Sequence, residues 1–185
     1  MPPNRWSPEG YTAAYWFAAH AHQGQTMPGM ELPYLVHVSL VTMEVMAALR
    51  TEPGHDEALA VQCALLHDVV EDTPVTIEQV EQAFGPAVAA GVLALSKDPR
   101  LDKALQMPDS LRRIRLQPPE IWMVKLADRI VNLQRPRPDW APERIRAYQA
   151  EGETILSALH DASPALAARL RHTIDHYLDY LSRTE

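Results

Sequence analysis

The chain of 185 residues has little cysteine, phenylalanine or glycine: one cysteine, two phenylalanines and seven glycines. A single cysteine, Cys63, excludes an internal disulfide and a zinc site built from cysteines. Cys63 stands within an apolar run, where it is expected to fill the core. No apolar run approaches the roughly 20 residues of a membrane-spanning helix, and the first residues lack the hydrophobic segment of a signal peptide. We therefore expect a cytoplasmic protein without a membrane partner.

Basic residues are also scarce. The chain has 17 Lys and Arg against 24 Asp and Glu, which gives a formal net charge of −7. Proteins that bind nucleic acid backbones usually carry a strongly basic face, so a nucleic acid polymer is not an expected partner. A local cluster of Lys and Arg can still bind one phosphate group, and a small anionic ligand is compatible with this composition. The length suits one domain over 1–185.

Apolar residues at helical spacing, separated by prolines, dominate the sequence. No segment alternates as a half-buried strand does, so we predict an all-α fold. Ser7, Thr76 and Ser163 are expected to cap helix N-termini. The predicted helices cover about 8–22, 34–50, 56–71, 76–84, 86–95, 109–116, 118–134, 142–160 and 164–181, with loops at 24–33 and 97–108.

Polar residues interrupt the apolar pattern in three of these helices. They are His37, then the group His67, Asp68, Glu71 and Asp72, and finally the stripe Lys125, Asp128 and Asn132. Each alone fits a core histidine, a solvated helix end or a surface stripe. Together, two imidazoles and two carboxylates from three helices can surround one divalent ion and leave positions open to water. Such a set suits manganese, iron or zinc better than calcium, and spare carboxylates beside the ion can transfer protons.

The segments around these residues resemble the HD-domain phosphohydrolases. They are similar in particular to the hydrolase domain of the RelA/SpoT alarmone enzymes and to the small, single-domain, Mesh-type alarmone hydrolases. The resemblance is clearest over about residues 11–150. The segments that carry it are 22–25, 33–37, 64–73 and 124–133, which read HQGQ, PYLVH, ALLHDVVEDT and VKLADRIVNL.

This resemblance implies a compact multi-helix fold with a metal site in its core, on which the helices 142–160 and 164–181 pack. It implies a manganese-dependent enzyme that removes pyrophosphate from the ribose 3′ position of guanosine tetra- or pentaphosphate. The residues it implies as metal ligands are His37, His67, Asp68 and Asp128. The residues it implies for water activation and proton transfer are Glu71 and Asp72. The substrate contacts it implies are Lys97, Lys125, Asn132, Arg144 and Tyr148.

One pair of positions departs from the family pattern. The family has an Arg-Lys pair where this chain has Thr26 and Met27, and each such phosphate contact is worth about 1.5–3 kcal/mol. Two alternatives therefore stay open: hydrolysis of another nucleotide, such as an adenosine alarmone or a phosphate of the NADPH type, and a module that binds a nucleotide without turnover. For a guanosine alarmone, the basic residues expected to compensate are Lys97, Arg144, Arg112, Arg113 and Arg115. The oligomeric state is left open.

Overall fold

The structure, a computed structural model, describes residues 4–137 and 139–183. Within these residues the fold is all-α, as predicted, and the bridge between Thr26 and Pro33 is the one β-type pairing. The α-helices are α1 Pro8–Ala21, α2 Leu35–Leu49, α3 Glu57–Leu66, α4 Val69–Asp72, α5 Ile77–Phe84, α6 Pro86–Leu95, α7 Lys103–Ile114, α8 Pro119–Asn132, α9 Pro142–Leu159 and α10 Pro164–His176. Two 3₁₀ helices follow α9 and α10: η1 His160–Ala162 and η2 Tyr177–Arg183.

Side-chain caps fix the starts of several helices where the sequence predicts them. The Ser7 hydroxyl accepts the backbone N–H of Gly10 at 3.1 Å, and the Ser163 hydroxyl accepts that of Leu166 at 3.1 Å. Thr76 and Gln79 form a capping box at the start of α5. These bonds satisfy N–H groups that have no partner within the helix.

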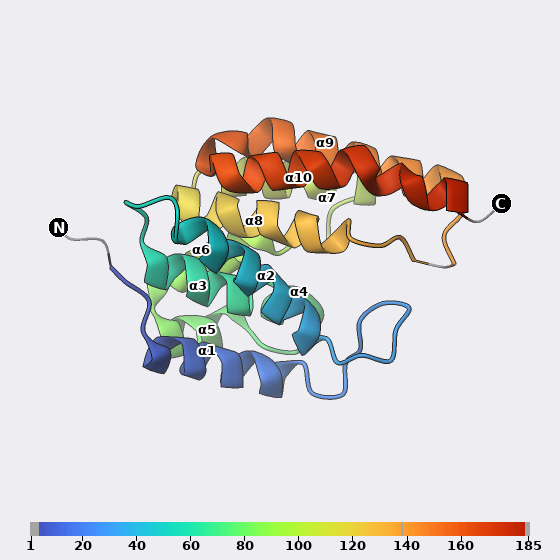
Figure 1. Ribbon diagram of the computed structural model, residues 1–185. Coiled ribbons are helices and arrows are strands. Elements are labelled where there is room, and N and C mark those ends of the chain that lie inside the picture. Colours follow the sequence, from blue (N-terminus) through green and yellow to red (C-terminus); the bar gives the residue numbers. More distant parts are fainter. Residues whose placement is uncertain (1–3, 138, 184–185) are drawn as a thin grey trace.

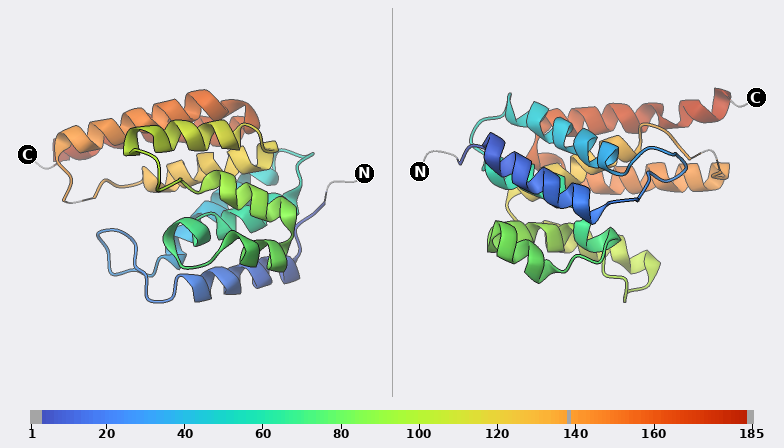
Figure 2. Two further views of the ribbon diagram at one scale, coloured as in Figure 1. Left: turned by 180° about the vertical axis from the view of Figure 1, so that it is seen from behind. Right: turned by 90° about the horizontal axis from the view of Figure 1, so that it is seen from below.

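Helix α8 is the centre of the molecule. It contacts α2, α3 and α6 on one side and α9 and α10 on the other, and its residues from Met123 to Val131 are all buried. Figure 1 shows α9 and α10 along one edge of the molecule and α1 along the opposite edge. Seen from behind, α6 and α7 lie side by side in front of this arrangement (Figure 2). The polar residues of this stretch, Lys125, Asp128 and Arg129, are therefore buried inside the molecule.

The predicted helix over 56–71 is interrupted. Helix α3 ends at Leu66 and α4 begins at Val69, so His67 and Asp68 lie in the junction. In an unbroken helix, neighbouring residues point about 100° apart. The break instead brings the His67 Nε2 atom within 2.9 Å of Asp68 Oδ2. The interruption therefore turns both side chains towards one point.

Two other predicted boundaries are wrong. The region 97–108 was expected to be a loop, but α7 begins at Lys103 and runs through Pro108 to Ile114. Pro108 cannot donate a backbone hydrogen bond, and burial of Leu111 and Ile114, with Met107 packed against the core, outweighs that loss. The helix predicted to end near 181 is α-helical only to His176 and continues as η2.

The close approach of α6 to α3 and α8 gives a test of the core. A Cβ added at Gly91 would lie 2.5 Å from Ile121 Cδ1 and 2.8 Å from Cys63 Sγ. Overpacking costs about 1–3 kcal/mol, which outweighs the gain of about 1 kcal/mol that alanine brings to a helix. We expect Gly91→Ala to lower the free energy of unfolding by up to about 2 kcal/mol, measured by urea denaturation.

The same substitution in α1 is the control. A Cβ at Gly10 would make ordinary contacts, 3.4 Å from Gln62 Nε2 and 3.5 Å from Ser7 Oγ. Gly10→Ala should leave stability unchanged or raise it. Equal stability of the two variants would contradict the tight packing at Gly91.

Candidate functional site

Three buried residues from separate parts of the chain meet in the core. They are His37 of α2, His67 of the α3–α4 junction and Asp128 of α8. The two Nε2 atoms of the histidines lie 3.3 Å apart. Asp128 Oδ1 lies 3.5 Å from His37 Nε2 and 3.9 Å from His67 Nε2. One donor atom of each residue thus lies within 4.8 Å of the others.

Asp68 extends this cluster. Its Oδ2 atom lies 2.9 Å from His67 Nε2 and 3.6 Å from His37 Nε2. The same oxygen accepts the hydroxyl of Tyr34 at 2.5 Å, a contact that sequence reasoning missed. Tyr34 precedes α2 and resembles any other apolar residue of that segment, so only the fold reveals its position beside Asp68.

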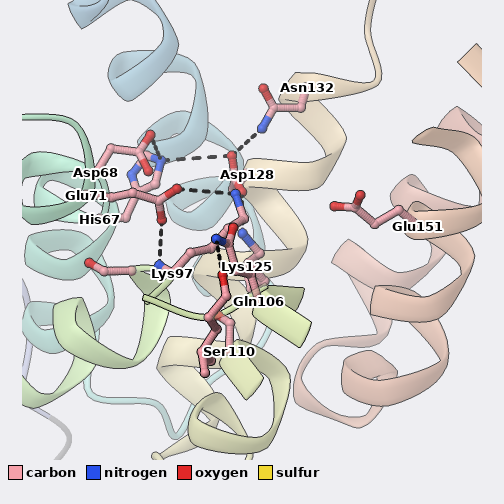
Figure 3. Close-up of polar contacts among 12 residues, drawn as sticks. His67, Asp68, Glu71, Lys97, Gln106, Ser110, Lys125, Asp128, Asn132 and Glu151 are labelled. Atoms are coloured by element: carbon pink, nitrogen blue, oxygen red, sulfur yellow. Dashed lines mark hydrogen bonds and ion pairs between the residues drawn. The ribbon is translucent and has the colours of Figure 1, made fainter. Parts of the chain in front are cut away.

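Hydrogen bonds fix the orientation of Asp128 and His67. Asp128 Oδ2 accepts the Lys125 ammonium at 2.9 Å, and Oδ1 accepts the Asn132 amide at 2.5 Å (Figure 3). His67 Nδ1 lies 2.8 Å from the carbonyl oxygen of Ala64. A carbonyl only accepts, so Nδ1 carries a proton, and in the neutral imidazole the lone pair of Nε2 faces the cluster.

The donor atoms fit a divalent metal ion. Ligands bound to one ion at about 2.1 Å lie about 3.0–3.4 Å from one another, and the separations here run from 2.9 to 3.9 Å. Nitrogen and oxygen donors together are typical of sites for manganese, iron or zinc. His37, His67 and Asp128, with Asp68 beside them, therefore have the chemistry and the spacing of a metal centre.

The electrostatics of the cluster also favour a cation. Burial opposes a charged imidazole, but hydrogen bonds and attraction from Asp128 and Asp68 outweigh it and raise the pKa of His37 to about 9. The pKa of His67 is raised by the same balance. The two imidazoles hold the pKa of the Asp68 carboxyl below its ordinary value of 3.8 in spite of burial. Lys125, followed by the imidazoles, does the same for the pKa of Asp128. Positive charge between the histidines and the two aspartates therefore stabilises both carboxylates. A metal ion can supply that charge in place of the protons on the imidazoles.

Glu71 and Asp72 follow the cluster on α4. Figure 3 shows Glu71 beside His67 and Asp68. Glu71 Oε2 accepts the backbone N–H of Lys97 at 2.7 Å, and Oε1 accepts its ammonium at 3.2 Å. Burial, followed by repulsion from Asp68 and Glu71, raises the pKa of Asp72. One carboxylate is thus held in place, and the other binds a proton more readily than usual.

A cleft of about 930 Å³ opens onto the cluster at His37 and Asp128. All five predicted substrate contacts line it, namely Lys97, Lys125, Asn132, Arg144 and Tyr148. Four further basic residues line it that sequence reasoning missed, namely Lys103, Arg129, Arg135 and Arg137. Within the described residues, its carboxylates are those of Asp128 and Glu151. Among the charged residues that line the cleft of this acidic protein, seven Lys and Arg face two carboxylates, an excess of positive charge that suits a ligand with several phosphates.

The loop 24–33 forms an apolar part of this cleft. Met27, Pro28 and Met30 line it, and Figure 1 places this loop at the same end of the molecule as the segment between α8 and α9. The basic cluster Arg112, Arg113 and Arg115, expected to compensate for the missing loop charges, is absent from the described lining. Arg113 instead donates to the carbonyl oxygens of Ala94 and Ser96 and pairs with Asp109. That expectation was wrong: Arg113 holds α7 to α6, and Arg112 pairs with Asp109 within α7.

Comparison with known proteins agrees with this geometry. Residues 14–165 match the family model described as HD domain. The chain is 30% identical over 164 residues to the guanosine-3′,5′-bis(diphosphate) 3′-pyrophosphohydrolase MESH1 of Mus musculus, which covers 86% of this chain and 89% of that protein. It is 35% identical over 152 residues to the bifunctional (p)ppGpp synthase/hydrolase SpoT of Escherichia coli K12, over 79% of this chain and 20% of that protein.

A solved structure has the same fold. It is described as a metazoan orthologue of SpoT that hydrolyses ppGpp, and it superposes with a TM-score of 0.81 at 25% identity, covering 92% of this chain and 97% of its own. Within the described residues, no helix combines the length and hydropathy needed to cross a membrane. The matched family, the shared fold and the buried His-His-Asp cluster lead to one conclusion: this chain belongs to the HD domain family and is an HD-domain phosphohydrolase related to MESH1 and SpoT.

Proposed function

We propose that this protein removes pyrophosphate from the ribose 3′ position of a guanosine alarmone such as guanosine tetraphosphate, with manganese as its metal ion. The observation that carries the proposal is the cation-lined cleft, because it opens onto two of the metal-binding residues and gathers all five predicted substrate contacts. The activities of MESH1 and SpoT support the same reaction.

The reaction transfers a pyrophosphoryl group from the ribose to water. The phosphorus attached to the ribose 3′ oxygen is attacked, its bond to that oxygen breaks, and pyrophosphate leaves while the ribose oxygen gains a proton. His37, His67, Asp68 and Asp128 would hold a divalent ion, which would supply a more acidic water and positive charge near the phosphoryl oxygens. Glu71, fixed by Lys97, accepts the proton of the attacking water. Asp72, with its raised pKa, supplies the proton that the ribose oxygen needs.

The substrate contacts divide into two kinds. Lys97 and Lys125 already pair with Glu71 and Asp128, so they position those carboxylates as well as adding charge. No carboxylate in the described part of the chain lies within ion-pair distance of Arg144, and its guanidinium lies 4.4 Å from the centre of the Trp140 ring. We therefore assign Arg144 to direct phosphate binding.

Incubation of the purified protein with candidate nucleotides tests this proposal. The protein is stripped with a chelator, reloaded with Mn²⁺ and mixed with guanosine tetraphosphate, its adenosine counterpart or NADPH, and products are separated by chromatography. We expect guanosine diphosphate and pyrophosphate from the first compound and no product without metal. Binding of all three compounds without any product would instead establish a non-catalytic module.

The apolar loop favours a second candidate, the hydrolysis of a different phosphorylated nucleotide. Met27 lines the cleft at a position where the alarmone enzymes carry a basic residue, so this wall offers contact with a base or sugar in place of charge. A higher kcat/KM for the adenosine compound or for NADPH than for the guanosine alarmone would favour this candidate.

Restoring the loop charges separates the two candidates. For a guanosine alarmone, Thr26→Arg with Met27→Lys should lower KM and leave kcat nearly unchanged, because added binding that is equal in ground and transition states acts on KM. Steady-state kinetics measures both constants. Met27→Leu is the matched control, since it keeps an apolar side chain in the lining. An unchanged KM in the charged variant would show that these positions do not touch the substrate.

A further inference from the structure

Several buried donor atoms at one end of the cleft have no hydrogen-bond partner. Arg129 is 3% exposed, yet its Nε and Nη1 atoms are unpartnered. The indole N–H of Trp140 and the hydroxyl of Tyr177 are also buried and unpartnered. All three residues line the cleft. A buried donor without an acceptor costs about 1–3 kcal/mol, and more when it is charged, so this arrangement indicates a ligand that supplies the acceptors.

These donors surround the ring of Tyr148. The Arg129 guanidinium carbon lies 4.4 Å from the centre of that ring. The ring centres of Trp140 and Tyr177 lie 4.9 and 6.3 Å from it. Glu151 accepts a hydrogen bond from Arg129 Nη2 and so fixes the guanidinium by one nitrogen. The remaining two nitrogens are left for another acceptor.

This group of donors is separate from the metal cluster. Asp128 and Arg129 are neighbours on α8 and point about 100° apart. Asp128 faces His37 of α2, whereas Arg129 pairs with Glu151 of α9. Figure 3 shows Glu151 on its own helix, away from Asp68 and Asp128. The cleft therefore has two ends that attract anions, one at the metal cluster and one at Arg129.

We infer that Arg129 binds a second phosphate of the nucleotide, one that is not cleaved, and that the Trp140 indole N–H and the Tyr177 hydroxyl donate to the same group. The inference rests on the proposed function for the ligand being a nucleotide, but it needs no turnover. It assigns phosphate recognition to α8, the segment before α9 and η2, and apolar contact to Met27, Pro28 and Met30 of the loop 24–33.

Calorimetric titration of the metal-free protein measures the phosphate binding at the Arg129 end of the cleft without a contribution from a bound metal ion. With a chelator present at constant ionic strength, guanosine diphosphate is compared with guanosine, which lacks phosphate. We expect wild type to bind the diphosphate at least about tenfold more tightly. Arg129→Met should reduce this ratio about tenfold, towards equal affinity for the two ligands, while the affinity for guanosine stays the same. Equal affinity of wild type for both ligands would overturn the inference.

Two further variants separate binding from support of the fold. Arg129→Lys keeps the charge but loses the planar fork, so its ratio should lie between those of wild type and Arg129→Met, and it serves as the test should the methionine variant not fold. Arg169→Met is the matched control, since Arg169 also pairs with a glutamate, Glu44, but lies outside the described lining. It should leave the ratio unchanged. A lowered melting temperature of Arg129→Met with an unchanged ratio would reduce Arg129 to a structural partner of Glu151.

Failure of this inference is distinguishable from failure of the proposed function. If the affinity ratio depends on Arg129, the second phosphate site is supported even when no alarmone is hydrolysed, because the titration contains no metal. If the alarmone is hydrolysed but the affinity ratio does not depend on Arg129, the proposed function is retained and only the second phosphate site is wrong. In an active enzyme, Arg129→Met should raise KM for the alarmone about tenfold or more and change kcat less.

Discussion

Alanine in place of His67 should remove tightly bound metal and reduce hydrolysis to near background. His67 supplies a lone pair that is oriented by its bond to Ala64 and faces His37 and Asp128. Loss of a residue that merely supports a ligand costs about 10–100-fold in metal affinity, and loss of a ligand should cost more. Asp68→Ala should behave in the same way. Metal content is measured by mass spectrometry on dialysed protein, and turnover by release of pyrophosphate.

The control for this experiment is His172→Ala, which removes an exposed histidine from α10. It should retain the full metal content and turnover of wild type. Because His67 is buried, circular dichroism must show that the His67 variant keeps its helices. A His67 or Asp68 variant with one full equivalent of tight metal and normal turnover would make the ligand assignment wrong.

Glu71→Gln should lower turnover by about 10²–10⁴-fold, the usual contribution of general acid–base catalysis. The amide keeps the shape of the side chain and an oxygen for the Lys97 backbone N–H, but it does not accept a proton from water. Metal content and melting temperature should stay at the wild-type values, because Glu71 is not among the clustered donors. Single-turnover kinetics at saturating Mn²⁺ measures the effect.

Glu81→Gln gives the matched comparison, since it makes the same change at an exposed position of α5. It should have no effect on turnover. If Glu71→Gln hydrolysed the alarmone at the wild-type rate, Glu71 would have no part in the reaction, and Asp72 alone would remain as the proton carrier.

Much of the fold was predictable because its helices are encoded locally. Apolar periodicity, together with caps such as Ser7 and Ser163, places most helices within a few residues of their observed ends. The exceptions depend on tertiary contacts. Nothing local reveals that α7 continues through Pro108, since the contacts of Leu111 and Ile114 with the core decide it. The interruption at His67 likewise depends on contacts outside its own segment.

The candidate site was predictable where polar residues interrupt an apolar helix. His37 and Asp128 are conspicuous for that reason, and the structure brings them together. Arg129 gives no such signal, because an arginine near the end of an amphipathic helix is ordinarily solvated. Arg129 is buried because Tyr148 of α9 and Tyr177 of η2 cover that part of α8. Long-range packing of this kind is not encoded in the spacing of residues.

The enclosed position of Cys63 makes this protein convenient for labelling chemistry. The thiol is fully buried beside Gly91 and Val88, and burial raises its pKa, so it is a poor nucleophile towards maleimides. It is also the one cysteine of the chain. Cysteines introduced on the loop 24–33 and on α9 would therefore carry a pair of fluorophores without prior removal of a native thiol. Energy transfer between them would report how far apart the two walls of the cleft stand before and after a nucleotide enters.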